Sequence, residues 1–454
     1  MSIRFRIALP LSILTVGLFL SVSPAWANGN YSHVWAATDA LNYLEEGELR
    51  DLLRRPDLLL MIQNGAMYPD SGYAVNDAYG EITHWEPFQT VYLEWIRDTF
   101  QPPWTDEAAQ HIAFLMGMAA HGMSDQLYDG MFLERAEFLD GYGDVSYMGG
   151  IDGVTDTCFA AAMGHKDPPE QWVPAEVLAP LYQVSDGHTL DPATIELGQS
   201  LVVVAVMFAN DRSQDEKNMA ELRASYPWSC GNQDNPQVPG SPVTHGPAIA
   251  NYWQVLWQRL HGSTSFDQPL LGTYFSTMEP YDQVQDASSP ESWVAFALPR
   301  GLNPSTVNPD TVKVTDPGMV EHPVQVKVYY GSNSHLVNIM PQVDWADDME
   351  YSVSITPPIT SWNEIPLETT HTFRFATSAR PPIQEDLAEE DVLEDAATDT
   401  DDTGSARPSS QGGCSLVAGL DTAALCCHFH PWLLLALTIL LLLSRLALGR
   451  LRIE

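Results

Sequence analysis

Residues 113–129 read AFLMGMAAHGMSDQLYD, and this stretch decides the fold. Apolar side chains fill most of its positions, while His121, Asp125 and Asp129 recur at four-residue steps. Residues four apart lie on one face of a helix, so these three side chains form a stripe on an otherwise apolar helix. Unpaired buried charge is costly, and a metal ion would offset that cost. The alternative is a set of ordinary surface or capping residues.

The helical pattern extends on both sides of this stretch. Thr105, followed by two acidic residues, is typical of a helix start, and the helix should run towards Phe132. Similar spacing predicts helices over 31–62, 86–100, 196–224 and 246–260, with a loop rich in Gly, Asn, Asp and Tyr over 63–82. No strand pattern precedes about residue 290. We therefore predict a mostly α-helical domain over residues 28–275.

The period of the sequence changes after this domain. Four segments alternate or carry β-branched residues, and Pro, Gly and Asn separate them. They are Val312–Val314, Val324–Tyr330, Tyr351–Ile355 and Thr370–Phe375. Short strands at this spacing predict a β-sandwich over residues 285–378. This part also resembles bacterial Ig-like domains, through Leu302–Val307, Asp344–Thr356 and Thr372–Thr377.

The N-terminus has the features of an export signal. Residues 1–27 begin with a basic segment, continue with an apolar run and end in Ala25-Trp26-Ala27, a small-x-small cleavage pattern. Removal of this signal peptide would leave Asn28 as the mature N-terminus. In an oxidising compartment Cys158 and Cys230 are candidates for a disulfide, although the sequence leaves their pairing open.

The C-terminal part predicts a tether. Residues 379–412 should form a disordered acidic linker, because ten acidic and no basic residues lie between Glu385 and Asp402. Residues 413–454 carry an apolar run followed by arginines, which predicts a transmembrane anchor with a cytoplasmic C-terminal end. The tail also resembles a myxobacterial-type sorting signal, which implies processing near Cys414. We expect the globular part to lie in the cell envelope, outside the cytoplasm, either anchored or released by processing.

The charge of the chain limits its partners. Asp and Glu number 59 and Lys and Arg 21, a formal net charge of −38. Such a surface repels phosphate backbones, so we expect no nucleic-acid partner. The sequence also has neither a G-x-S-x-G nucleophile motif nor a Gly-rich phosphate loop, which argues against those two kinds of active site.

Several separate motifs resemble the zinc-dependent phospholipase C family, and more closely the catalytic domain of glycosylphosphatidylinositol-specific phospholipase D. They occur in the family's order between about residues 28 and 185. The motifs are Ser32–Val34, Asn64–Tyr73, Thr83–Phe88, the helix 113–125, Gly149–Asp156 and Trp172–Tyr182. The resemblance implies a metal-dependent phosphodiesterase that acts on phospholipid or membrane substrates.

The resemblance also assigns ligands residue by residue. Those that match the family's first zinc site are Asp70, His84, His121 and Asp125. His33 matches a ligand of another zinc, which Asp125 and the amine of mature Asn28 would complete. Asp70 matches the residue that orients or deprotonates the attacking water in the family.

A further part of the cluster departs from the family pattern. Asp129 stands where the family has a His, and Asp152 and Asp156 stand where the phospholipases C have His-x3-Glu. Three oxygen ligands suit Ca²⁺, Mg²⁺ or Mn²⁺ better than Zn²⁺. We therefore expect two or three bound ions, mainly zinc, with a harder cation at the Asp-rich site.

Two other functions remain open at this stage. An S1/P1-type nuclease shares the metal scaffold, although the negative charge argues against it. A non-catalytic cation-binding surface module is the other, because the substitutions at Asp129 and Asp152 would also fit a degenerate site.

Overall fold

The computed structural model describes residues 29–141, 151–164, 166–263, 266, 286–329 and 333–377. All of the described residues belong to one compact unit. Within the described residues, every α-helix lies between Asn30 and Leu260 and every strand between Val294 and Ala376. The predicted signal peptide, acidic linker and C-terminal tail lie outside the described residues.

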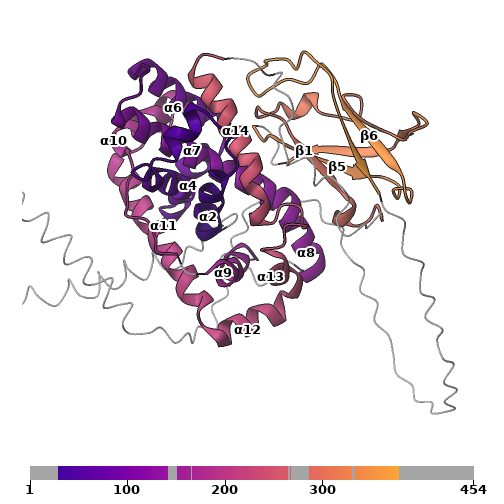
Figure 1. The fold of residues 1–454 in the computed structure, drawn as a ribbon, viewed down its shortest axis with the longest axis horizontal. Helices are drawn as coiled ribbons and strands as arrows, with labels where there is room; N and C mark the ends of the chain where they lie inside the picture. Colours follow the sequence, from indigo (N-terminus) through magenta and orange to yellow (C-terminus); the bar gives the residue numbers. More distant parts are fainter. Residues whose placement is uncertain are drawn as a thin grey trace, which may run out of the picture. The chain divides into compact units, whose positions relative to one another are not determined.

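The helical region, residues 29–263, accounts for the first part of the fold (Figure 1). Its longer helices are α2 (Asn30–Ala40), α4 (Leu59–Ala74), α6 (Glu86–Thr99), α7 (Asp106–Leu127), α9 (Ile151–Met163), α10 (Ala175–Asp186), α11 (Pro192–Ser213), α12 (Glu216–Ser225) and α14 (His245–Leu260). Shorter ones are α3 (Glu48–Leu53), α5 (Tyr79–His84), α8 (Glu134–Asp140), α13 (Pro227–Asn232) and the turns η1 (Tyr128–Leu133) and η2 (Pro242–Thr244).

Of two predictions for the N-terminal part, one is confirmed and one was wrong. The helical pattern expected over 31–62 is present as three helices, because the chain turns after α2 and again before α4, where Pro56 disfavours helix at the preceding residue. The loop expected over 63–82 is mostly helix, formed by α4 and α5. Tertiary contacts explain why this segment contains residues of low helix propensity. Gly65 and Gly72 allow neighbouring backbones to approach closely. The buried side chain of Asn64 forms hydrogen bonds with the backbone of Glu170 and Trp172.

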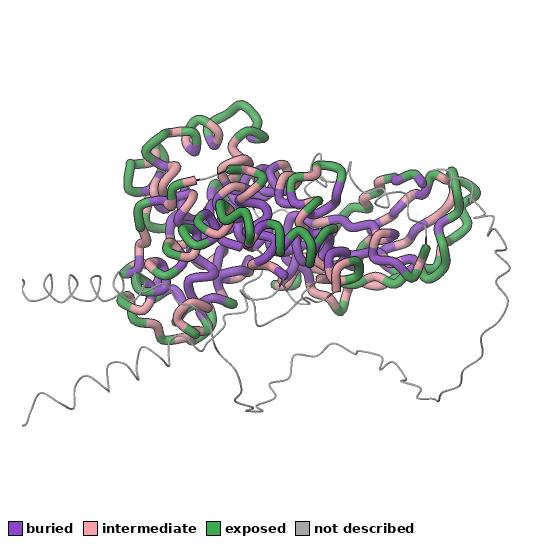
Figure 2. The backbone as a smooth tube through the Cα atoms, turned by 90° about the horizontal axis from the view of Figure 1, so that it is seen from below, coloured by how far each residue is buried: buried purple, intermediate pink, exposed green. Residues whose placement is uncertain are grey.

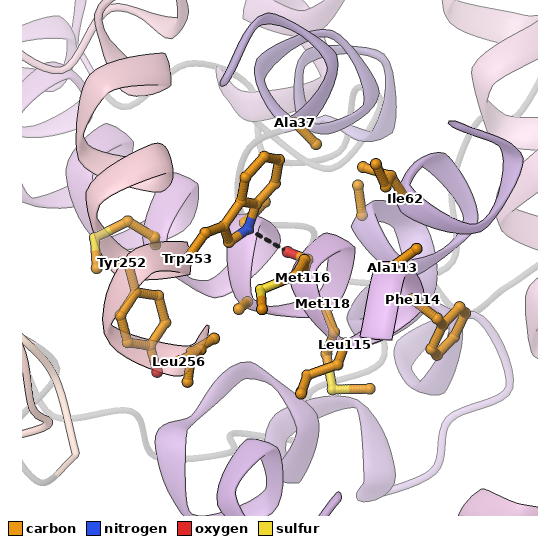
Figure 3. Packing of buried hydrophobic residues seen from close by; sticks show 14 of the residues in the cluster. Ala37, Ile62, Ala113, Phe114, Leu115, Met116, Met118, Tyr252, Trp253 and Leu256 are labelled. Atoms are coloured by element: carbon orange, nitrogen blue, oxygen red, sulfur yellow. Dashed lines mark hydrogen bonds between the residues drawn. The ribbon is translucent and has the colours of Figure 1, made fainter. Parts of the chain in front are cut away.

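Helix α7 forms the centre of the helical core, as its apolar sequence predicts. Thr105 accepts a hydrogen bond from the backbone of Ala108 and caps its start. Figure 3 shows Trp253 of α14 packed on α7, with its indole donating to the carbonyl of Met116 at 2.6 Å. Buried positions fill the interior of the described chain, while exposed ones lie at its outer turns (Figure 2). After Leu127 the helix widens into the π-turn η1, so the predicted helix reaches Phe132 with a change of register.

A disulfide joins Cys158 of α9 to Cys230 of α13, the pairing that the sequence left open. Helices α9, α12 and α13 lie together, away from α6 and α10 (Figure 1).

Among the described residues, α11 is the one helix whose length and apolar composition would allow it to cross a membrane. It nonetheless packs on α4, where Gln199 donates to the carbonyl and side chain of Asn64.

The sheet region, residues 286–377, contains two antiparallel sheets that share one apolar core. One has the order β1-β5-β4 and the other β3-β2-β6-β7. The strands are β1 (Val294–Ala297), β2 (Val312–Thr315), β3 (Glu321–His322), β4 (Val324–Val328), β5 (Leu336–Pro341), β6 (Glu350–Ile355) and β7 (His371–Ala376). The four strands expected from the sequence are present, whereas β1, β3 and β5 were not predicted. β5 is buried along most of its length, so it lacks the alternation that marks a half-exposed strand.

Candidate metal centre

The crossing of α4 and α7 sets the position of the candidate site. A Cβ at Gly65 would collide with the backbone of Phe114, and a Cβ at Gly117 with the backbone of Ile62. The two helix backbones therefore touch. One to two turns beyond this contact, α4 presents Asp70 and α7 presents His121 and Asp125.

Four donor atoms from three helices converge beyond the crossing. The Nε2 atoms of His84 and His121 are 3.0 Å apart, and Oδ2 of Asp125 lies 3.1 Å from each. Oδ1 of Asp70 lies 3.9 Å from His84 Nε2 and 3.7 Å from His121 Nε2. Four ligands about 2.0–2.1 Å from a tetrahedral ion would be roughly 3.3 Å from one another. The measured separations bracket that value, so the donor set fits a zinc-sized ion.

The histidine tautomers leave both Nε2 atoms available. Nδ1 of His84 bonds to the carbonyl of Gly80 at 2.7 Å, and Nδ1 of His121 to that of Ala66 at 2.6 Å. A carbonyl only accepts, so each Nδ1 carries the proton and each neutral ring has a lone pair at Nε2. Outer hydrogen bonds of this kind orient metal-binding histidines. Two facing lone pairs are repulsive without a cation or a proton between them.

Asp125 connects this cluster to a second group. While Oδ2 faces His84 and His121, Oδ1 lies 3.1 Å from Nε2 of His33, whose ring stacks on that of His121 at 3.7 Å. Burial alone would raise the pKa of Asp125, but the histidines hold it well below its usual range. His33, His121 and Asp125 thus form a second candidate ligand group that shares residues with the first.

Asp70 is fully buried and asymmetric in its contacts. Its Oδ2 accepts a hydrogen bond from the side chain of Asn30 at 3.1 Å, whereas Oδ1 accepts none from the described residues. Burial raises the pKa of Asp70 to about 7, and the nearby Asp125 adds to this while His121 opposes it. The free oxygen is the one that faces the histidines.

Asp129 and Asp152 form an acidic group beside the first cluster. Each has one buried oxygen, Oδ1, that accepts no hydrogen bond from the described residues. Burial raises the pKa of both well above the usual range, and for each a nearby carboxylate adds to the shift, Asp152 for Asp129 and Asp125 for Asp152. Buried carboxylates that repel one another in this way are typical of a cation site. Asp129 lies in the π-turn η1, and Asp125 and Asp70 are close enough to add to the rise in its pKa.

Asp156 has a different environment. Its Oδ1 accepts from the backbone and hydroxyl of Ser32 at 2.8 and 2.6 Å, and its Oδ2 accepts from the backbone of Tyr31 at 3.3 Å. The carboxylate therefore caps the start of α2, immediately beside Gly29. The predicted ligand Asn28 lies outside the described residues.

His84 lies where the cluster approaches the surface. The carboxylate of Glu81 accepts from the Tyr73 hydroxyl at 2.6 Å and from the Trp85 indole at 2.7 Å. The Tyr73 ring lies 5.3 Å from the imidazole of His84. Two half-exposed aromatic rings and a carboxylate thus form a rim next to the candidate ligands.

Sequence reasoning missed two polar residues that support the site. Asn30 is the partner of Asp70, and Glu86 is a buried carboxylate two residues after His84. Burial disfavours the charge of Glu86, but Arg259 and Arg300 lower its pKa to about 2. The sequence gives little indication that Glu86 supports the site, because its partners Arg259 and Arg300 are far away in the chain.

No family model matches the chain. It is similar to the phosphatidylinositol-glycan-specific phospholipase D of Rattus norvegicus, with 27% identity over 143 residues, covering 28% of this chain and 17% of that one. The corresponding values are 26% over 175 residues for Bos taurus, covering 34% and 20%, and 30% over 131 residues for Homo sapiens, covering 27% and 15%. The chain thus spans a fifth or less of the length of these relatives.

Among solved structures, the chain is matched to domains 1–6 of surface layer protein SbsC at 11% identity, covering 70% of this chain and 45% of that chain. The TM-score is 0.18, which is too low to indicate a common fold.

Proposed function

We propose that the chain is a zinc-dependent phosphodiesterase that hydrolyses phospholipids. The observation that carries this proposal is that the Nε2 atoms of His84 and His121, 3.0 Å apart, each lie 3.1 Å from an oxygen of Asp125 and 3.7–3.9 Å from an oxygen of Asp70. The similarity to the glycan-specific phospholipases D supports a phospholipid as the substrate.

The four residues would hold the first ion through His84 Nε2, His121 Nε2 and one oxygen each of Asp70 and Asp125. A divalent ion at this position supplies acidified water at neutral pH and neutralises charge on the phosphate. The hydrogen bonds that His84 and His121 donate to the carbonyls of Gly80 and Ala66, and the one that Asp70 accepts from Asn30, fix the orientation of these side chains.

In the reaction, a water oxygen attacks phosphorus and the bond from phosphorus to the leaving oxygen breaks. Asp70 is the proposed group that orients this water or accepts its proton. It would do so through the lone pair of Oδ1 that does not bind the ion, since Oδ1 accepts no hydrogen bond from the described residues.

A second and a third ion are part of the proposal. His33 and Asp125, with the amine of Asn28, would hold one of them. Asp129 and Asp152 would hold the other, and their oxygen atoms favour Ca²⁺, Mg²⁺ or Mn²⁺ over Zn²⁺. The buried, unbonded Oδ1 atoms of Asp129 and Asp152 support the presence of a cation there.

The cellular context is also a proposal. Residues 1–27 would direct export, the sheet region would act as an Ig-like domain, and the tail 413–454 would anchor the protein in the cell envelope. A tethered phospholipase stays close to lipid, which raises the effective concentration of its substrate.

The test combines metal analysis with hydrolysis assays. The purified protein is assayed for zinc and other metals, and for cleavage of phosphatidylcholine with and without chelator. Bound zinc and chelator-sensitive cleavage support the proposal, and the products distinguish C-type from D-type cleavage. Cleavage of single-stranded DNA instead of lipid would favour the nuclease. A calcium-only protein inert towards both substrates would favour the cation-binding module.

A further inference from the structure

We infer that the sheet region is a positioning element of the candidate metal centre, because it holds the residues that follow three candidate ligands in the chain. The inference rests on the proposed function only in requiring that the centre binds metal. It concerns how the ligands are held and not which substrate is cleaved.

The first contact is at Glu86, two residues after His84. Its carboxylate accepts from Nε of Arg300 at 2.6 Å and from the backbone nitrogen of Gly301, both in the sheet region. Arg259 of α14 completes the group at 2.7 Å, and all three side chains are buried. A buried carboxylate is stable only while paired, so Glu86 is fixed to the sheet region. Because His84 ends α5 and Glu86 begins α6, this anchor also limits the movement of the imidazole.

The second contact is at Gln126, directly after Asp125. Its side-chain oxygen accepts from the Ser334 hydroxyl at 2.9 Å and from the backbone nitrogen of His335 at 2.7 Å. The ring of His335 also lies 3.7 Å from the carboxylate of Glu86. One loop of the sheet region therefore contacts the segments of two ligands at once.

The third contact is at Gly130, directly after Asp129. Its carbonyl accepts from the Asn338 side chain of β5 at 2.9 Å, and a Cβ at this position would collide with Leu336. Tyr329, which follows β4, packs against the same glycine. The sheet region thus covers the π-turn that carries Asp129.

These three contacts lie beside candidate metal ligands, and not only on apolar surfaces as in ordinary packing between domains. They fall on polar groups next to ligands from α5, α7 and η1, and they are buried together with Ala295 and Leu336, which join the helical core. Hydrogen bonds that orient metal ligands from outside change metal affinity 10–100-fold when removed. Loss of the sheet-region partners should therefore weaken metal binding and not only lower stability.

The experiment measures Zn²⁺ affinity of the whole protein by competition with a chromophoric chelator, together with the visible absorption of the Co²⁺-substituted form. The variants are Arg300→Met and Ser334→Ala, with Arg300→Lys as the conservative change. The matched control is Arg374→Ala, because Arg374 pairs with Glu350 on the exposed side of the sheet region.

Arg300→Met should weaken Zn²⁺ binding about 10–100-fold and Ser334→Ala about 10-fold, with a changed Co²⁺ spectrum. Arg300→Lys should recover part of the loss, and the control should match the wild type. Zinc affinities within twofold of wild type for both test variants would overturn the inference. Should Arg300→Met fail to fold, Ser334→Ala alone decides.

The two proposals fail in different ways. A wild-type protein that binds zinc but cleaves no lipid would overturn the proposed function and leave this inference standing. Wild-type cleavage together with unchanged affinity in the variants would overturn only the inference. A wild-type protein without zinc affinity would overturn both.

Discussion

The Nε2 atoms of His84 and His121 lie 3.0 Å apart, although each ring already directs its other nitrogen to a backbone carbonyl. The two Nε2 atoms therefore face each other in the buried interior of the protein. Asp125 completes the arrangement at 3.1 Å from both atoms. The donor atoms come from separate helices, so only the folded chain brings them together.

Replacing His121 with Ala should abolish zinc binding at the first site and lipid cleavage with it. The expected loss of zinc affinity exceeds the 10–100-fold typical of an outer hydrogen-bond partner, because a ligand itself is removed. Isothermal titration with Zn²⁺ measures it. His111→Ala is the matched control, since His111 is a buried histidine whose partner is the Tyr92 hydroxyl. Equal zinc affinity in both variants would count against the assignment.

Asn30→Ala should lower zinc affinity about 10–100-fold while the four ligands remain. The side chain of Asn30 holds Oδ2 of Asp70, and without it the carboxylate is free to rotate. Asn42→Ala, at an exposed position bonded to Asp39, serves as the control. An unchanged affinity in Asn30→Ala would show that packing alone orients Asp70.

The contribution of Asp129 and Asp152 to the stability of the metal-free protein should increase as the pH falls. Burial raises the pKa values of Asp129 and Asp152 above those of the unfolded chain, so the folded state binds more protons. The stabilisation is complete below the unfolded pKa of about 4 and is lost as the pH rises through the folded values. Melting temperatures in chelator, from about pH 8 to about pH 5, measure this trend.

The double variant Asp129→Asn with Asp152→Asn should flatten that pH dependence, whereas Asp310→Asn at an exposed position should not. Added metal at high pH should restore the stability of the wild type but not that of the double variant. A difference in melting temperature between the wild type and the double variant that stays constant across this range would refute the buried-carboxylate interpretation.

Gly117→Ala should destabilise the protein by about 1–3 kcal/mol, because the added methyl group meets the backbone of α4. Gly231→Ala is the control, since its Cβ would meet open space within α13 and should add about 0.5–1 kcal/mol of helix stability. Chemical denaturation measures both. The crossing is less tight than described if the two substitutions have effects of the same sign.

Replacing Cys158 and Cys230 together with Ala should cost about 4 kcal/mol of stability, because the disulfide closes a long segment with a sequence separation of 72. The same loss should follow when the wild type is reduced, and reductant should then have no further effect on the variant. Thermal melts with and without reductant compare the two. Wild-type stability that does not respond to reductant would contradict the pairing.

Features that depend on neighbouring residues in the sequence were predicted, whereas features that depend on contacts between distant residues were not. Local spacing was sufficient for α7, with its cap at Thr105, and for four strands of the sheet region. It failed over 63–82, because Gly65 and Asn64 are explained by α7 and by residues 170–199 and not by their own helix propensity. A propensity argument cannot detect such tertiary causes.

The same holds for the candidate site. The residues that converge around Asp125 were predicted, because ligand types and motif order are visible in the chain. The outer partners were not: Glu86 and Arg300 are 214 positions apart, and Gln126 and Ser334 are 208 apart. Hydrogen bonds between such distant positions leave no periodic signal.

The spread of the site along the chain has a consequence for how the protein is made. Candidate ligands begin at His33 and continue to Asp156, while the loop that contacts their neighbours is at His335. A ribosome must therefore synthesise about three quarters of the chain before the contacts at Glu86 and Gln126 can form. In cells, the metal that a site acquires depends strongly on which metals are available. The compartment in which this chain finishes folding would then decide which ion it carries.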